Sequence, residues 1–127
     1  AYIRKRAGHL ASKMRFMTAQ FEAYLQNDLW LALAKRANQK AEELEKMVEA
    51  SPVIRLAWPR QINEVFAVLA RADLVKLQEN GLHCAVWQPP LAERDLVGPD
   101  EVMIRLVTSW TTSDSEVRQF AKLLGAL

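Results

Sequence analysis

Apolar residues near the start of the chain recur at alternating steps of four and three positions. This spacing places them on one side of a helix, because one helical turn takes 3.6 residues. We predict one continuous helix over residues 2–26. Gly8 interrupts it, at a cost of about 1 kcal/mol relative to alanine. A stripe of this length indicates a core or a subunit interface; its members are Ile3, Ala7, Leu10, Met14, Met17, Phe21 and Tyr24.

A second amphipathic helix is predicted to run to about residue 50. Asn27 or Asp28 is expected to cap its start, since either side chain accepts a hydrogen bond from a free backbone amide. Ser51 and Pro52 end it, because proline disfavours helical geometry in the residue before it. The face predicted to be buried carries Trp30, Leu33, Ala37, Ala41, Leu44 and Met47.

From residue 53 onward the pattern becomes extended and the segments become short. Asn80-Gly81 is a typical helix stop, and Ser113 with Glu116 forms a capping box for a last helix that ends near Gly125. Short connections between strands favour an antiparallel or mixed sheet with helices on one face. The fold class is therefore α+β. We predict strands at 53–57, 64–69, 82–87 and 102–108, a helix at 72–79 and a loop at 88–100.

Composition narrows the classes of partner. The 127 residues are 50% hydrophobic and 25% charged, as in ordinary globular proteins, and no apolar run approaches the ~20 residues of a bilayer span. A net charge of +2 without a concentrated basic patch argues against nucleic-acid binding. No Cys/His spacing suits zinc or another metal. The single cysteine, Cys84, rules out an internal disulfide and favours a cytoplasmic location.

One charged residue stands out in an apolar strand. Arg105 lies within the segment MIRLV and is followed by the polar run TSWTT. Arginine keeps its charge, so a partly buried guanidinium needs an anion or an array of acceptors. Two interpretations stay open: a structural salt bridge to a glutamate, or a fork that binds a carboxylate through two hydrogen bonds. His83 and Cys84 are adjacent in a predicted strand and so point to opposite faces, which disfavours a nucleophile pair.

Three segments resemble the threonine-aldolase-like family of bacterial lyases. Residues 4–20, RKRAGHLASKMRFMTAQ, resemble the segment just after that family's cofactor lysine. Residues 28–31, DLWL, followed by Ala37-Asn38, resemble its next helix, and residues 104–110, IRLVTSW, resemble its strand near the C-terminus. The matches occur in the family's order but cover only the C-terminal portion of its length.

The resemblance implies the small C-terminal domain of an aspartate-aminotransferase-like, fold type I enzyme. Residues 1–50 would be linking helices at an interdomain or subunit interface, and residues 51–127 the α+β small domain. Such enzymes use pyridoxal phosphate as an electron sink to cleave threonine-like β-hydroxy-α-amino acids to glycine and an aldehyde. Arg105 would bind the substrate carboxylate, and Lys5 and Arg6 would lie near the cofactor phosphate.

The resemblance also implies what this chain lacks. The lysine that forms the Schiff base would lie upstream of Ala1, so we expect no catalytic residue here, no covalently bound cofactor and no activity of the chain alone. The expected partners are an amino-acid substrate, the rest of the enzyme and further copies in a dimer or tetramer. Two alternatives remain: another β-eliminating amino-acid lyase of the same fold, or a helical interaction or scaffolding domain without catalysis.

Overall fold

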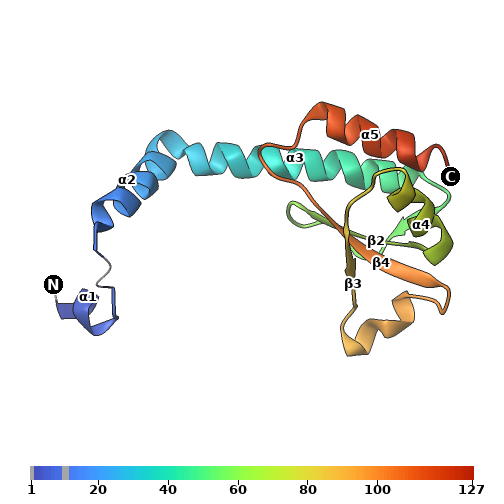
Figure 1. The fold of residues 1–127 in the computed structure, drawn as a ribbon, viewed down its shortest axis with the longest axis horizontal. Helices are drawn as coiled ribbons and strands as arrows, with labels where there is room; N and C mark the ends of the chain where they lie inside the picture. The colour runs from blue at the N-terminus through green and yellow to red at the C-terminus, as the bar shows by residue number, and fades with distance from the viewer. Residues whose placement is uncertain (1, 10–11) are drawn as a thin grey trace. The chain divides into compact units, whose positions relative to one another are not determined.

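The computed structural model describes residues 2–9 and 12–127 and divides the chain into two compact units, Ala1–Ala32 and Leu33–Leu127 (Figure 1). The division falls inside helix α3 (Leu29–Ala50). The second unit therefore starts earlier than residue 51. The predicted assignment of residues 1–50 to linking helices and of 51–127 to a small domain stays a prediction.

The first unit is helical, but its helix is not continuous. The structure has α1 (Tyr2–Arg6), α2 (Met14–Leu25) and a 3₁₀ turn, η1 (Gln26–Asp28). The prediction of one helix over 2–26 is therefore wrong, and its members Leu10 and Ala11 lie outside the described residues. Gly8 has φ 74° and Lys13 φ 59°, both left-handed angles that an α-helix does not contain. The glycine ends the first helical segment rather than being tolerated within it.

The start of α3 also differs from expectation. Asn27 and Asp28 have φ values of 52° and 57°, whereas an N-cap residue has extended backbone angles. Neither residue therefore has the backbone geometry predicted for a cap. Asparagine and aspartate tolerate left-handed geometry better than other non-glycine residues, which explains why they form this turn. No residue of α1 or α2 within the described range is buried; the exposed apolar side chains include Phe16, Met17, Phe21 and Tyr24.

The second unit contains a four-stranded sheet in the order β1-β2-β4-β3, antiparallel throughout. The central pair aligns Val65 with Leu106 and Ala67 with Ile104. The predicted α+β class with an antiparallel sheet is thus confirmed. β3 is shorter than expected because residues 82–84 lie outside the ladder. The strands are β1 (Ile54–Leu56), β2 (Glu64–Ala70), β3 (Ala85–Trp87) and β4 (Glu101–Val107).

Three helices cover one face of this sheet, and α3 and α5 are seen together on that side in Figure 1. They are α3, α4 (Arg71–Glu79) and α5 (Asp114–Leu124). Alternation along β2 and β4 sends every second side chain into the core between sheet and helices. This core includes Ala41, Leu44, Val48, Val65, Ala67, Leu69, Leu74, Leu77, Val102, Ile104, Leu106, Val117, Phe120 and Leu124.

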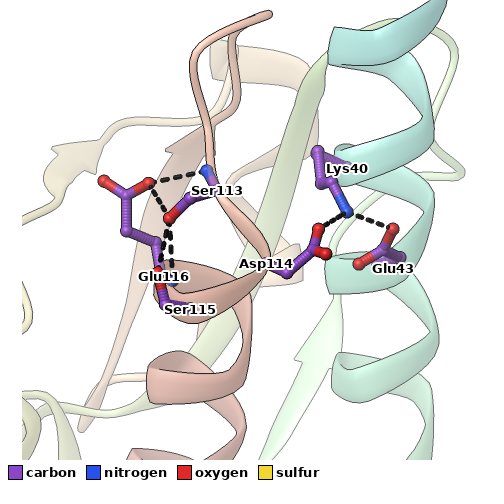
Figure 2. Close-up of polar contacts among 6 residues, drawn as sticks. All are labelled: Lys40, Glu43, Ser113, Asp114, Ser115 and Glu116. Carbon is purple, nitrogen blue, oxygen red and sulfur yellow. Dashed lines mark hydrogen bonds and ion pairs between the residues drawn. The ribbon is translucent and has the colours of Figure 1, made fainter.

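Several predicted boundaries are confirmed. Gly81 has φ 96° just after α4, and Ser113 forms the capping box of α5 with Glu116, drawn in Figure 2. The predicted loop 88–100 contains a 3₁₀ segment, η2 (Leu91–Leu96), preceded by Pro90. Among the described residues, no helix is long and apolar enough to cross a membrane.

Candidate carboxylate-binding site

Arg105 lies in the middle of β4, on the sheet face opposite the helices. Its neighbours Ile104 and Leu106 are buried in the core, so strand alternation turns Arg105 to the other side. Its Cα partners are Phe66 on β2 and Ala85 on β3. We call this side the distal face; by register it carries Arg55, Glu64, Phe66, Val68, Ala85, Trp87, Met103 and Arg105.

Among the described residues, the Arg105 guanidinium forms a cation–π contact with Trp87 and an ion pair with Glu64. Its central carbon lies 4.6 Å from the centroid of the Trp87 ring, within cation–π range. Its Nη1 lies 3.5 Å from Oε1 of Glu64, an ion pair longer than an ordinary hydrogen bond. The Arg105 side chain is 32% exposed. Its buried Nε has no hydrogen-bond partner among the described residues.

A row of aromatic rings supports Trp87. Phe66 meets Trp87 edge to face at 5.7 Å between centroids, and Trp58 meets Phe66 in the same way at 5.2 Å. The indole Nε1 of Trp58 donates a 2.6 Å hydrogen bond to Glu93. Edge-to-face pairs are favourable beyond the area they bury, so these contacts fix the ring against which the guanidinium lies.

The loop carrying Trp58 and the end of β4 are each tied to α3. Glu45 of α3 accepts hydrogen bonds from the backbone N and the Nε of Arg60 at 3.0 and 2.9 Å. Thr108 is 2% exposed, and its hydroxyl donates to the carbonyl of Ala37 at 2.8 Å. The Asn63 side chain donates to the carbonyl of Thr108 at 2.6 Å. The strand ends beside Arg105 are therefore held to the helical layer.

The residues predicted to lie near the cofactor phosphate belong to the first unit. Lys5 and Arg6 are exposed residues of α1 and have no buried environment. Arg105 belongs to the second unit. The assignment of Lys5 and Arg6 to a cofactor phosphate therefore stays a prediction.

Lys40 does not have the environment of a lysine that binds a cofactor covalently. Lys40 is the most enclosed lysine that forms an ion pair; it donates to Asp114 at 2.6 Å and to Glu43 at 2.7 Å (Figure 2). The hydrogen bonds to Asp114 and then Glu43 raise the pKa of Lys40, which keeps the amine protonated. A Schiff-base lysine must lose its proton to react. Lys40 therefore fits a role in joining α3 to α5, not in cofactor attachment.

Cys84 and His83 do not form a reactive pair. Cys84 packs against the core, and burial raises the pKa of its thiol. His83 is exposed. A reactive cysteine has the opposite shift, because the thiolate is the nucleophile. Within the described part of the chain, no cluster of three or more His, Cys, Asp or Glu residues could hold a metal ion.

Sequence reasoning identified Arg105 but missed Glu64 and Trp87. Both belong to other strands, and their contact with Arg105 depends on the register of two antiparallel pairs. The available signal was weak: an acidic residue begins the strand-forming run 64–70, and an aromatic one ends the strand at 87.

Comparison with known proteins identifies homologues, and this chain matches only part of their length. No protein-family model matches the chain. It is 35% identical over 118 residues to low-specificity L-threonine aldolase of Pseudomonas aeruginosa, which covers 93% of this chain and 31% of that protein. The enzyme of the same name from Pseudomonas sp. strain NCIMB 10558 is 32% identical over 117 residues, covering 92% and 31%. The chain thus spans about a third of these relatives.

Solved structures give the same result. Leishmania major threonine aldolase superimposes with a TM-score of 0.81 at 28% identity, covering 98% of this chain and 34% of that one. The aminotransferase TlmJ from Streptoalloteichus hindustanus has a TM-score of 0.57 at 14% identity, covering 76% and 32%, and shares the fold alone.

The arrangement of sheet, helices and leading long helix is that of the C-terminal region of a fold type I pyridoxal-phosphate enzyme. Within that class, the chain is similar to low-specificity L-threonine aldolase over nearly all of its length. The resemblance predicted from the sequence is therefore confirmed.

Proposed function

We propose that this chain is the substrate-carboxylate-binding portion of a pyridoxal-phosphate-dependent aldolase that cleaves threonine-like β-hydroxy-α-amino acids. The observation that carries the proposal is the state of Arg105. Its side chain is about two-thirds buried and its guanidinium cannot lose its charge. It has only a 3.5 Å ion pair and a ring face as partners, with a buried Nε left unpaired among the described residues.

An unpaired buried donor is costly, at about 1 to 3 kcal/mol. A carboxylate would remove this cost by accepting hydrogen bonds from the planar fork, since Arg–carboxylate pairs are commonly bidentate. Binding the carboxylate in this way would fix the amino acid relative to the bond that is cleaved. Both sequence relatives are low-specificity L-threonine aldolases, which supports an aldolase and gives no support to a scaffolding domain.

The lysine that binds the cofactor covalently would belong to the rest of the enzyme. We assign no step of the reaction to the lysines of this chain. Lys5 and Arg6 are proposed to lie near the cofactor phosphate in the intact protein. We also propose that the protein works in the cytoplasm, where a free Cys84 is stable, and as a homo-oligomer. The exposed apolar side chains of α2 would supply part of the contact surface.

Replacement of Arg105 in the intact protein tests the proposal. Arg105→Lys keeps the charge but loses the fork, so it should not restore function lost in Arg105→Ala. We expect a loss of about 2 to 5 kcal/mol of binding, which is roughly 30- to 4,000-fold in kcat/KM for the amino acid. Cofactor absorbance and melting temperature should change little.

A structural arginine predicts the reverse result. If Arg105 served only a salt bridge with Glu64, its replacement would lower the melting temperature and leave kcat/KM of the folded enzyme unchanged. That outcome would refute the carboxylate assignment.

A further inference from the structure

We propose that Glu64 is a resident counter-ion of Arg105 that the substrate carboxylate replaces, and that Trp87 is the positioning residue that holds the guanidinium during the exchange. This inference rests on the proposed function of Arg105. It assigns roles to two residues on different strands and predicts that their replacement has opposite effects on carboxylate affinity.

Two other Arg–Glu pairs of the second unit are shorter than the pair of Arg105 with Glu64. Arg55 and Glu101 are separated by 2.6 Å, and Arg60 and Glu45 by 2.9 Å. In both pairs the glutamate also accepts a backbone hydrogen bond, from Gly98 to Glu101 and from Arg60 to Glu45. These carboxylates are therefore fixed from two sides.

Glu64 is held differently. It approaches Nη1 of Arg105 only to 3.5 Å, and no hydrogen bond to its carboxylate is formed among the described residues. The Glu64 side chain is 26% exposed and that of Arg105 is 32% exposed, so solvent reaches both. A long, solvent-accessible ion pair contributes little. Glu64 thus partly neutralises Arg105 but does not satisfy its hydrogen-bond donors.

Trp87 contacts Arg105 by a different surface. The central carbon of the guanidinium lies over the ring, 4.6 Å from its centroid, and the ring takes up none of the guanidinium's N–H donors, which point outward in the guanidinium plane. A carboxylate can therefore bind at the edge while the contact with Trp87 persists. Phe66 and Trp58 support Trp87, and Glu93 anchors Trp58. The carboxylate in this row, Glu93, accepts its hydrogen bond from the Trp58 indole.

The exchange also leads to a specificity rule. Glu64 is the first residue of β2, so its displaced carboxylate would remain close to the bound substrate. A second negative charge on the substrate would then be repelled, because like charges at short range disfavour binding. Hydroxy-amino acids with uncharged side chains should therefore be preferred over those with acidic ones.

Steady-state kinetics of the intact protein test the proposal, with propionate as a competitive inhibitor that probes the carboxylate alone. Glu64→Gln should lower KM for threonine and Ki for propionate by roughly two- to fivefold. Trp87→Leu should raise both by roughly two- to thirtyfold, and Trp87→Phe should recover most of that loss because it keeps an aromatic face. In all three variants kcat should stay within about twofold.

Matched controls use residues outside the site. Glu101→Gln removes the charge from another Arg–Glu pair of the sheet, and Val86→Ala alters an exposed neighbour of Trp87 on β3. Both should leave KM and Ki unchanged. Glu64→Gln should also reduce discrimination against a substrate with an acidic side chain, which loss of packing alone would not do.

The outcomes separate this inference from the function on which it rests. Higher or unchanged KM and Ki in Glu64→Gln would overturn the counter-ion role, and unchanged values in Trp87→Leu would overturn the positioning role. If Arg105→Lys and Arg105→Ala also left KM and Ki unchanged, the proposed function itself would fail.

Discussion

Replacing Thr108 by valine tests whether the link between β4 and α3 stabilises the fold. The Thr108 hydroxyl is buried and donates to the Ala37 carbonyl at 2.8 Å, with a weaker contact of 3.3 Å to the Asn63 carbonyl. Valine has nearly the same shape but no donor. The substitution therefore removes hydrogen bonding without opening a cavity.

The expected magnitude follows from what the two acceptors retain. The Ala37 carbonyl lies within continuous α3 and keeps its helical partner, and the Asn63 carbonyl still accepts from the backbone N of Thr108 at 3.0 Å. Neither acceptor is left unpaired. The loss should be close to the net value of one hydrogen bond, about 1 kcal/mol, and not the ~3 kcal/mol of an orphaned buried group.

Urea unfolding of the 127-residue chain, followed by far-UV circular dichroism, measures this loss. About 1 kcal/mol corresponds to a fall of roughly 4 °C in melting temperature for a chain of this size. Thr111→Val is the control, because Thr111 is exposed and surface substitutions usually change stability by less than about 0.5 kcal/mol. Equal effects of the two substitutions, or a gain in stability from Thr108→Val, would refute the reasoning.

Three further substitutions test local features. Ser113→Ala removes the capping box of α5 and should cost about 1 kcal/mol of unfolding free energy, whereas Ser115→Ala, two residues further along, should cost less. Gly81→Ala should destabilise by about 1 kcal/mol through the left-handed φ of 96° alone, since no atom lies within 4 Å of the added Cβ; an unchanged urea midpoint would contradict this. The hydrogen bond from Lys40 lowers the pKa of Asp114, so its stabilisation is present above the unfolded-state value near 3.9 and is lost as pH falls through the folded value. Asp114→Asn should therefore flatten the acid limb of stability against pH.

The sequence predicted the second unit well because its signals are local. Alternating apolar residues in 64–69 and 102–108 indicated which side chains are buried, and Gly81 and the Ser113 box marked helix ends. The first unit was predicted less well. Periodicity alone does not show whether a glycine such as Gly8 is tolerated within a helix or ends it; the backbone at Gly8 and Lys13 decided this.

The site around Arg105 was predicted only in part, because its partners are not local in the sequence. The charge of Arg105 in an apolar strand is visible in the sequence, but its partners are set by strand order. β4 lies between β2 and β3, which brings Glu64 and Trp87 to the same arginine from segments 41 and 18 residues away in the chain. Such long-range pairing has no local sequence signal.

The half-buried Cys84 has a practical consequence. It is the chain's single cysteine, and desolvation, which raises its pKa, keeps its thiol protonated and slow to react. Its alkylation rate would therefore increase when the segment that joins α4 to β3 detaches transiently from the core. The native chain thus carries a built-in chemical probe of local opening beside Arg105, and comparing that rate with and without a bound carboxylate would measure how firmly the ligand closes this edge of the sheet.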